Sequence, residues 1–235
     1  MKIALLGYGK MGKTIEQVAL SRGHEIVLRA ETVVTTDQLS EADIAIEFSV
    51  PEAAFLNITA ALEVGVPVIS GTTGWLKDYD KAVALCHQKN GAFIYASNFS
   101  LGVNIFFQIN EYLAKMMGSH TQYEVLMEET HHIHKLDKPS GTAITLAEGI
   151  IRQTAKQQWS LDKSDTKNLL IESKRIGEVP GTHTVRYHST EDDLVLTHEA
   201  HNRNGFALGA VIAAEWLSGK QGVFSMKDVL DLQNL

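Results

Sequence analysis

The sequence predicts an α/β protein in two parts. The first part is a parallel sheet covered by helices, and the second is an α+β region with an open mixed, largely antiparallel sheet. Strand-like and helix-like segments alternate over the first hundred residues, a glycine-rich turn joins the first strand to the first helix, and later strands follow one another directly. The 235 residues suffice for two modest domains, each with its own core.

Five short apolar runs predict the parallel strands, at residues 2–6, 25–30, 42–48, 66–70 and 92–97. Helices between them imply parallel pairing, because a crossover helix returns the chain to the same end of the sheet. The predicted helices begin near Met11, span Pro51–Val64 and span about Lys77–Lys89. Proline suits the first turn of the second of these helices.

The stretch GYGKMG places glycines at positions 7, 9 and 12, between the first strand and the first helix. In the G-x-G-x-x-G pattern the glycines permit a tight turn, and the helix N-terminus offers free N–H groups to a pyrophosphate. An acid, Glu31, ends the second strand about 20 residues later, as this kind of site requires. The context therefore favours a Rossmann-type dinucleotide-binding domain over a turn without a ligand. The cofactor-binding residues predicted here are Gly7, Tyr8, Gly9, Lys10, Met11, Gly12 and Glu31.

The carboxylate of Glu31 also bears on the choice of dinucleotide. It can accept hydrogen bonds from ribose hydroxyls and would repel a 2′-phosphate, and Thr32 rather than arginine follows it. NADH is therefore favoured over NADPH, although Lys10 and Arg29 are positive charges that can offset the repulsion.

Two further loops follow the fourth and fifth strands, where a parallel sheet gathers its ligands. These loops, SGTTG and ASNFSLGVN, offer small residues, hydroxyls and backbone N–H groups. Each pattern is also typical of a simple turn. Their position makes them candidates for the nicotinamide half of the cofactor, and the residues predicted to bind it are Gly71, Thr72, Thr73, Ala96, Ser97, Asn98 and Phe99.

The pattern changes from about residue 100 onwards. The order predicted there is a helix at 104–117, a strand at 123–131, a helix at 140–157, and strands at 169–177, 181–189 and 193–203. Two helices, at 205–219 and 223–232, follow. We expect residues 1–99 and about 204–235 to form the dinucleotide-binding domain. Residues 100–203 are expected to form a substrate-binding and oligomerisation domain.

The segment EETHHIHKLDKPSGTA, residues 128–143, combines proton carriers with a helix start. Ser140 suits the N-cap of the following helix, so Ser140, Gly141 and Thr142 are predicted to form an anion pocket for a carboxylate or phosphate. The groups before it are His131, His132, His134 and Lys135. They are suited to acid–base and anion-binding work, because histidine gives and takes protons near neutral pH.

Two other interpretations of the histidines remain open. Zinc is one of them, but adjacent histidines converge poorly on one ion and no cysteine accompanies them, so no metal is predicted. A loop of solvated histidines is the other.

Composition excludes several other classes of protein. The net charge of −7 argues against a nucleic-acid partner, and the lone Cys86 rules out an intramolecular disulfide. The beginning of the chain does not resemble a secretory signal, and the most apolar stretch is interrupted by Glu215 and too short to cross a bilayer. We therefore expect a cytoplasmic protein that does not enter a membrane.

Residues 129–143 match throughout the signature E-x-H-H-x-x-K-x-D-x-P-S-G-T-A, so the sequence closely resembles the dihydrodipicolinate reductase family, also called 4-hydroxy-tetrahydrodipicolinate reductase. The resemblance extends over nearly the whole chain. Further blocks in family order are GYGKMG, DIAIEFSVPEA, VISGTTGW, ASNFSLGVN and HEAHNRNGFALGA.

The resemblance implies reduction of a small cyclic dicarboxylate to tetrahydrodipicolinate by NADH or NADPH, in the lysine and diaminopimelate pathway. It also implies that His131 is the proton donor and acceptor and Lys135 a proton donor. The substrate carboxylates would be held by His132 and by the turn at 140–142, with Thr73 between nicotinamide and substrate. Family members are usually homotetramers.

The chain departs from the family pattern near the adenosine end of the cofactor. Its glycine loop is one residue shorter, Lys10 replaces a common arginine, and the stretch from Glu31 to Asp43 is too short for a full helix. Cofactor preference is therefore left open. Two alternative functions remain: another nicotinamide-dependent oxidoreductase of amino-acid metabolism, similar to aspartate dehydrogenase, and a non-catalytic NAD sensor.

Overall fold

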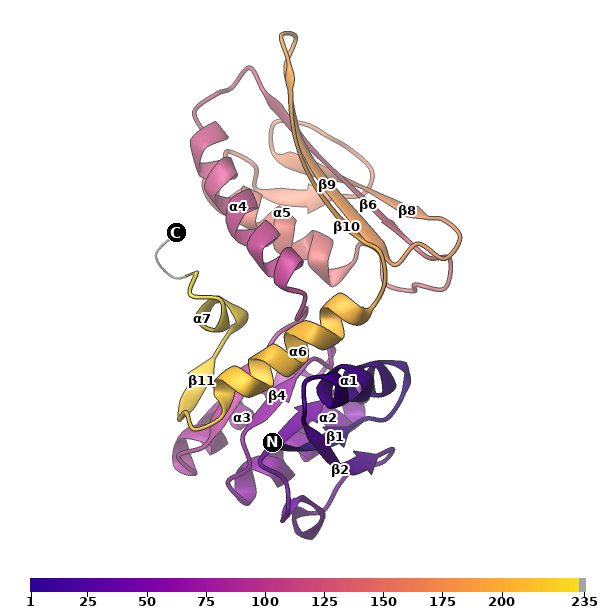
Figure 1. The fold of residues 1–235 in the computed structure, drawn as a ribbon. Coiled ribbons are helices and arrows are strands. Elements are labelled where there is room, and N and C mark those ends of the chain that lie inside the picture. The colour runs from indigo at the N-terminus through magenta and orange to yellow at the C-terminus, as the bar shows by residue number, and fades with distance from the viewer. Residues whose placement is uncertain (233–235) are drawn as a thin grey trace. The chain divides into compact units, whose positions relative to one another are not determined.

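The computed structural model describes residues 1–232, so the last three residues of the predicted first domain, 233–235, lie outside the described residues. The chain divides into two compact units. Among the described residues, unit 1 contains Met1–Leu101 and residues 203–232, and unit 2 contains Gly102–Asn202. Each unit has its own sheet and its own helices (Figure 1).

Unit 1 is built on a six-stranded sheet in which every pairing is parallel. Its four central strands are buried almost throughout, because helices cover both faces and the apolar runs leave no polar side to expose. The five predicted strands are confirmed. Across the sheet the order is β11 (Gly222–Phe224), β5 (Ala92–Tyr95), β4 (Val68–Ser70), β3 (Ile44–Glu47), β1 (Lys2–Leu6) and β2 (Glu25–Ala30).

Helices of unit 1 pack on the two faces of this sheet and form two cores. One core contains side chains from α1 (Lys10–Ser21) and α6 (Asn204–Leu217), and the other contains side chains from α2 (Pro51–Glu63) and α3 (Tyr79–Gln88). Between β2 and β3 the chain makes only a short 3₁₀ turn, Thr36–Leu39, so the prediction that no full helix fits there is confirmed.

The C-terminal segment differs from the prediction of one helix at 223–232. Its first residues form strand β11, which pairs in parallel with β5, and only Met226–Val229 form a helix, α7. A run of three residues carries no detectable period, so pairing at the sheet edge decided its conformation.

Unit 2 is a five-stranded sheet packed against two helices. Its core joins side chains of α4 (Leu101–Met117) and α5 (Gly141–Gln153) to the buried sides of β6, β8 and β9. The strand order is β10 (Asp193–Ala200), β9 (Gly181–His188), β6 (Glu124–His131), β8 (Asn168–Arg175) and β7 (Gln158–Ser160).

The sheet of unit 2 is mixed, with two antiparallel and two parallel pairings. The prediction of a mixed sheet is confirmed: β6, β9 and β10 pair antiparallel, whereas β8, whose direction was not predicted, runs parallel to β6. The helix predicted to reach residue 157 ends at Gln153, and a short strand, β7, follows. The connection through α5 returns the chain to the same end of the sheet, which makes the next strands parallel.

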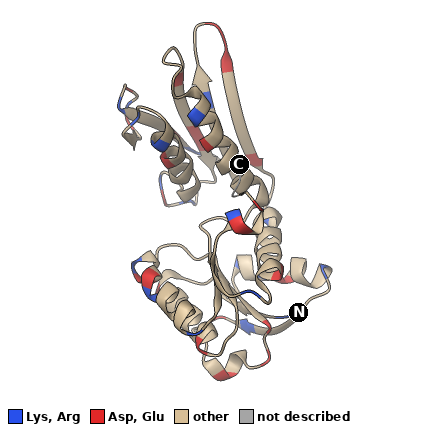
Figure 2. Cartoon of the chain, turned by 90° about the vertical axis from the view of Figure 1, so that its left-hand side faces the viewer, with Lys and Arg blue, Asp and Glu red and all other residues tan. Residues whose placement is uncertain are grey.

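Charged residues of both signs are interspersed along both units (Figure 2). None of the helices in residues 1–232 combines the length and apolar character that a membrane span requires.

Candidate active site

The glycine-rich turn of unit 1 leaves no room for side chains at two positions. Gly7 has φ +106°, and a Cβ there would lie 2.1 Å from the carbonyl oxygen of Phe48. A Cβ at Gly12 would lie 2.2 Å from the carbonyl oxygen of Gly7. The Gly7 N–H donates to the carbonyl of Ala30 at 2.9 Å, which ties the turn to the end of β2. The turn is therefore packed tightly between β2 and the loop after β3.

Helix α1 begins directly at this turn, and its start borders a cavity of about 370 Å³. No side chain caps the helix and no acid lies in its first turn, so its N-terminal N–H groups and dipole favour an anion. The cavity lies at the carboxyl ends of β1, β3 and β4, where the strand order reverses. Six of the predicted cofactor residues line it: Gly9, Lys10, Met11, Gly71, Thr72 and Thr73.

A buried carboxylate that was not predicted from the sequence organises the loops around this cavity. Glu47, at the end of β3, is fully buried and accepts hydrogen bonds from the hydroxyls of Ser70 (2.6 Å) and Thr72 (2.8 Å) and from the N–H of Ser49 (2.9 Å). The Thr72 hydroxyl is thus used inside the protein, whereas Thr73 is exposed. An acid ending an otherwise apolar buried run was the signal for this residue.

The loop after β5 lies beside the loop after β4. The Ala96 N–H donates to the Ser70 carbonyl at 3.1 Å, and Ser97 is exposed. Phe99 is only 1% exposed and packs against Phe48, with ring centroids 5.7 Å apart. Phe99 therefore belongs to the core that supports the predicted cofactor residues around it.

At the adenosine end of the predicted site, the arginine beside Glu31 is paired with another acid. Glu31 is exposed immediately after β2. Arg29 donates from Nε to Oε1 of Glu16 at 2.8 Å, and the Tyr8 hydroxyl donates to the other oxygen of Glu16. Hydrogen bonds from Arg29 and Tyr8 hold the pKa of Glu16 below its usual value. The positive charge of Arg29 is therefore already compensated.

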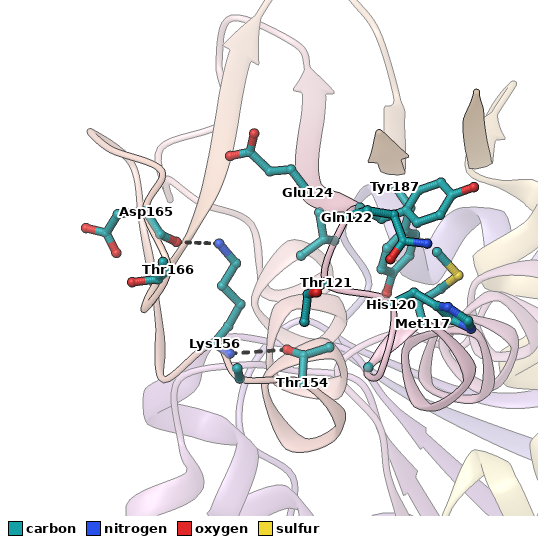
Figure 3. A pocket seen from close by; sticks show the side chains of 14 residues that line it. Met117, His120, Thr121, Gln122, Glu124, Thr154, Lys156, Asp165, Thr166 and Tyr187 are labelled. Atoms are coloured by element: carbon teal, nitrogen blue, oxygen red, sulfur yellow. Dashed lines mark hydrogen bonds between the residues drawn. The ribbon is translucent and has the colours of Figure 1, made fainter. Parts of the chain in front are cut away.

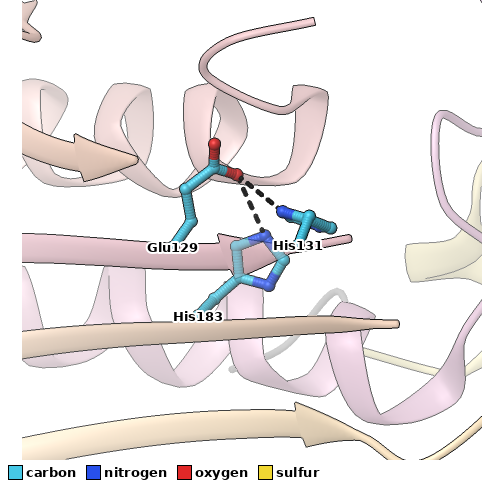
Figure 4. Close-up of side chains that lie close together, drawn as sticks. All are labelled: Glu129, His131 and His183. Carbon is cyan, nitrogen blue, oxygen red and sulfur yellow. Dashed lines mark ion pairs between the residues drawn. The ribbon is translucent and has the colours of Figure 1, made fainter. Parts of the chain in front are cut away.

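In unit 2, the alternation of β6 places Glu129 and His131 on its buried side, facing the helices. The Glu129 side chain is fully buried, and its Oε2 lies 3.2 Å from Nδ1 of His131 (Figure 4). His131 itself is 7% exposed. The predicted proton donor is therefore held against an ionised group at the end of a strand.

Strand register brings further groups to Glu129. Glu129 lies opposite Ser173 of β8 and His183 of β9 in the sheet register. Its carboxylate accepts hydrogen bonds from the Ser173 hydroxyl (2.9 Å) and from Arg175 Nη2 (3.2 Å). Burial by itself raises the pKa of Glu129. The hydrogen bonds from Ser140 and Ser173 and the nearby His131 outweigh this effect and lower the pKa of Glu129 well below the usual range.

His183 is a third buried member of this cluster and was not predicted. Its ring packs edge-on against His131 with centroids 5.0 Å apart, and its Nε2 lies 3.2 Å from Oγ of Ser140. Burial, followed by the charge of His131, lowers the pKa of His183 to about 3. A histidine on the buried side of an alternating strand was the sequence signal.

The lowered pKa of His183 predicts that the folded protein becomes less stable in acid. Between about pH 6.5 and pH 3 the unfolded chain binds a proton at residue 183 that the folded protein does not, so the free energy of unfolding falls as the pH falls. The expected slope is about 1.4 kcal/mol per pH unit in that window. Below about pH 4.5 Glu129 adds to the loss, because its folded pKa is also lowered. Urea denaturation at stepped pH values measures the dependence.

Two variants make this measurement specific. His183→Gln cannot take up the proton and should show a shallower pH dependence, whereas His201→Gln, at an exposed position, should retain it. Equal slopes for wild type and His183→Gln would contradict the assignment.

Ligand atoms of Glu129, His131 and His183 lie within 4.8 Å of one another, the distance range of a metal site. The chemistry of the carboxylate disfavours a cation, because Arg175 already compensates its charge and the Ser140 N–H and the Ser173 hydroxyl donate to it. The arrangement therefore suits a hydrogen-bonded acid–base group.

The loop after β6 carries the remaining proton carriers. Lys135 is 23% exposed at its side chain, and its Nζ lies 2.8 Å from Asp137. Its carbonyl accepts a hydrogen bond from Arg175 at 3.3 Å, and that guanidinium also donates to the Asp137 carbonyl at 2.6 Å. Through these two hydrogen bonds Arg175 holds the loop after β6 against strand β8. His132 is half-buried, and His134 is exposed, so the solvated interpretation applies to His134 alone.

Helix α5 begins where the sequence predicts. Ser140 is its N-cap, and the Oγ of Ser140 accepts the Ala143 N–H at 3.1 Å. Ser140 is 2% exposed and its own N–H donates to Glu129, whereas Gly141 is exposed and Thr142 half-buried. Gly141 and Thr142 therefore supply the accessible surface of the predicted anion pocket, and the buried Ser140 supports them.

Another cavity, of about 430 Å³, lies in unit 2 (Figure 3). It surrounds the first residues of β6, at the opposite end of that strand from His131. None of the predicted site residues lines it. Its lysine, Lys156, already donates to the backbone carbonyls of Asp165 and Asn168. The predicted chemistry is therefore concentrated at the opposite end of the strand.

Comparison with known families covers both units. The family model for the N-terminus of dihydrodipicolinate reductase matches residues 1–99, and the model for its C-terminus matches residues 102–230. The chain belongs to the dihydrodipicolinate reductase family.

Relatives of this family align along nearly the whole chain. The 4-hydroxy-tetrahydrodipicolinate reductase of Christiangramia forsetii is 54% identical over 98% of this chain and 98% of its own length. The enzyme of Neisseria meningitidis with the same name is 32% identical over 93% of this chain and 85% of its own. These relatives confirm the resemblance based on the signature.

A solved structure of the same family shares the fold. Dihydrodipicolinate reductase from Paenisporosarcina sp. TG-14, bound to dipicolinate, superposes with a TM-score of 0.78 at 19% identity, over 96% of this chain and 97% of its own. The predicted combination of a Rossmann-type domain with an α+β domain is therefore confirmed.

Proposed function

We propose that this protein reduces 4-hydroxy-tetrahydrodipicolinate to tetrahydrodipicolinate with NAD(P)H, in the biosynthesis of diaminopimelate and lysine. One observation carries the proposal: three residues of the family signature, Glu129, His131 and Ser140, meet in one buried cluster at the start of α5. The substrate is a small cyclic dicarboxylate, and the exposed first turn of that helix suits one of its carboxylates.

In this proposal unit 1 binds the dinucleotide and unit 2 binds the substrate. The dinucleotide supplies a hydride to the substrate ring. His131 supplies the accompanying proton, and Lys135 provides a second donor and a positive charge within the same loop. His132, Gly141 and Thr142 would orient the carboxylates, supported by Ser140, and Thr73 would contact the nicotinamide when it is bound. A positioned acid of this kind contributes ~10²–10⁴-fold to the rate.

For the cofactor, the family supports NAD(P)H, and we propose a preference for NADH. The exposed Glu31 follows β2 directly, beside the turn at Gly7. Arg29, the cation closest to Glu31 in sequence, is engaged by Glu16. The carboxylate of Glu31 would therefore repel a 2′-phosphate, and the Arg29 guanidinium that could attract this phosphate is already paired with Glu16.

Glu31→Ala tests this preference. The variant should weaken NADH binding roughly tenfold, the contribution of hydrogen bonds to a charged acceptor, and should weaken NADPH binding less. Dissociation constants from quenching or enhancement of nicotinamide fluorescence measure both, with the exposed Glu41→Ala as control. Equal losses for the two dinucleotides would remove the ribose role from Glu31.

We also propose a cytoplasmic homotetramer. The edge strand β10 exposes two adjacent apolar residues, Leu194 (39%) and Val195 (47%), and an open sheet edge of this kind favours association with further copies. Sedimentation equilibrium of the wild type and of Val195→Glu measures the state. A monomeric wild type would contradict the tetramer.

An absorbance assay tests the function itself. The protein and NADH are mixed with the freshly generated condensation product of aspartate semialdehyde and pyruvate, and the absorbance of NADH is followed. Loss of NADH only with this product is expected. Loss with other oxo acids would favour an enzyme similar to aspartate dehydrogenase, and absence of any turnover would favour an NAD sensor.

A further inference from the structure

Glu129 contacts both chemical elements of the proposed substrate site. Its Oε2 lies 3.2 Å from Nδ1 of His131, the proposed proton donor. Its two oxygens lie 3.1 and 3.2 Å from the backbone nitrogen of Ser140, where the anion-binding helix begins. A single buried carboxylate therefore sets the distance between the donor and the start of the helix.

The surroundings of Glu129 keep it fixed and ionised. It is fully buried, and the Ser173 hydroxyl and the Arg175 guanidinium, both from β8, bond the Oε1 side of the carboxylate. Glu129, Ser173 and His183 are register partners on three adjacent strands, so the sheet itself holds these groups in place. The other oxygen of the carboxylate, Oε2, is therefore the one that lies near His131.

The position of His131 determines which of its nitrogens can exchange a proton. Nδ1 lies 3.2 Å from Oε2 of the carboxylate, and Nε2 lies beside Gly181, where an added Cβ would approach it to 3.0 Å. Glycine at 181 thus leaves space beside Nε2 that a side chain would fill. A carboxylate next to Nδ1 favours the tautomer that carries its proton on Nδ1.

We propose that Glu129 is a positioning residue of the reductase, which holds His131 in the Nδ1–H tautomer and fixes the start of α5 beside it. In the step, Nε2 of the imidazolium gives its proton to the substrate, and the Nδ1 proton stays between His131 and Glu129. Glu129 takes up no proton. This inference rests on the function proposed above, because that function requires a proton from His131.

The experiment combines nitrogen NMR of the histidine rings with steady-state kinetics of the full chain. The His131 signals are assigned by their disappearance in His131→Asn. At alkaline pH the wild-type ring should show the Nδ1–H tautomer, and Glu129→Gln should shift it toward Nε2–H, because a glutamine N–H can donate to Nδ1. The same variant should lower kcat by about 10²-fold, within the range for general acid catalysis, with the KM for NADH nearly unchanged.

Glu128→Gln is the matched control. Glu128 is the adjacent residue of β6 on the other side of the sheet, where it pairs with Lys174. This variant should keep the wild-type tautomer and the wild-type kcat. If Glu129→Gln lowered kcat only because less of the protein folded, the His131 tautomer of the folded molecules would stay unchanged.

The tautomer is measured without substrate, so the two proposals fail separately. A wild-type His131 in the Nε2–H form would overturn the positioning role, whatever the turnover, and this result does not depend on the folding of Glu129→Gln. An unchanged tautomer and kcat in Glu129→Gln would overturn it as well. An Nδ1–H tautomer that depends on Glu129, in a protein that does not consume NADH with the expected substrate, would support the geometry and reject the proposed reaction.

Discussion

Lys135→Ala is expected to lower kcat by about 10²- to 10⁴-fold, the contribution of a well-placed general acid, and to leave NADH binding nearly unchanged. The reason is that the proposed proton donor and the proposed dinucleotide site belong to different units. The Lys135 ammonium belongs to the loop of unit 2 that follows His131, whereas the cavity at the start of α1 belongs to unit 1. Stopped-flow single turnovers and NADH titrations measure the two quantities independently.

Lys138→Ala serves as the control for this variant. Lys138 lies in the same loop and is exposed, so its removal changes the net charge equally without removing the proposed donor. It should retain kcat. Wild-type turnover in Lys135→Ala would show that the catalytic assignment is wrong, and equal losses in both variants would indicate a general effect of charge.

Gly12→Ala is expected to weaken NADH binding and to lower kcat/KM by on the order of 100-fold, since displacements near 1 Å at a site have effects of this size. A Cβ at residue 12 would lie 2.2 Å from the carbonyl oxygen of Gly7, which is backbone and cannot rotate away. The start of α1 must therefore move away from the turn, and the N–H groups that would bind a pyrophosphate move with it.

The control for Gly12→Ala is another helix-initiating glycine of unit 1. At Gly205, in the first turn of α6, the nearest atom to an added Cβ is 3.9 Å away, at Ser100. Gly205→Ala should bind NADH as the wild type does. Thermal unfolding of both variants separates loss of binding from loss of folding. Wild-type affinity in a folded Gly12→Ala would contradict the close packing of the turn.

Local patterns in the sequence were sufficient for much of the fold. Continuous apolar runs and helical stripes identify the strands and helices of unit 1, because burial on both faces requires apolar residues throughout. The N-cap Ser140 and the glycines of the turn are likewise local requirements of helix ends and tight turns. The signature at 129–143 identified the family for the same reason, since its residues are contiguous.

Other features depended on contacts between distant segments. The direction of β8 and the conversion of residues 222–224 into strand β11 were missed, because short or central strands take their direction from their neighbours. The role of Glu47 was missed because hydroxyls 23 and 25 residues away satisfy it.

The same contrast holds for the candidate site. The sequence by itself determined a glycine turn before a helix, an acid after the second strand, and a run of histidines, lysine and serine before another helix. Only the tertiary structure decided that Glu129, His183 and Arg175 surround His131. Strand register, which no local pattern encodes, brought groups 43 to 46 residues apart into hydrogen-bonding distance of one another.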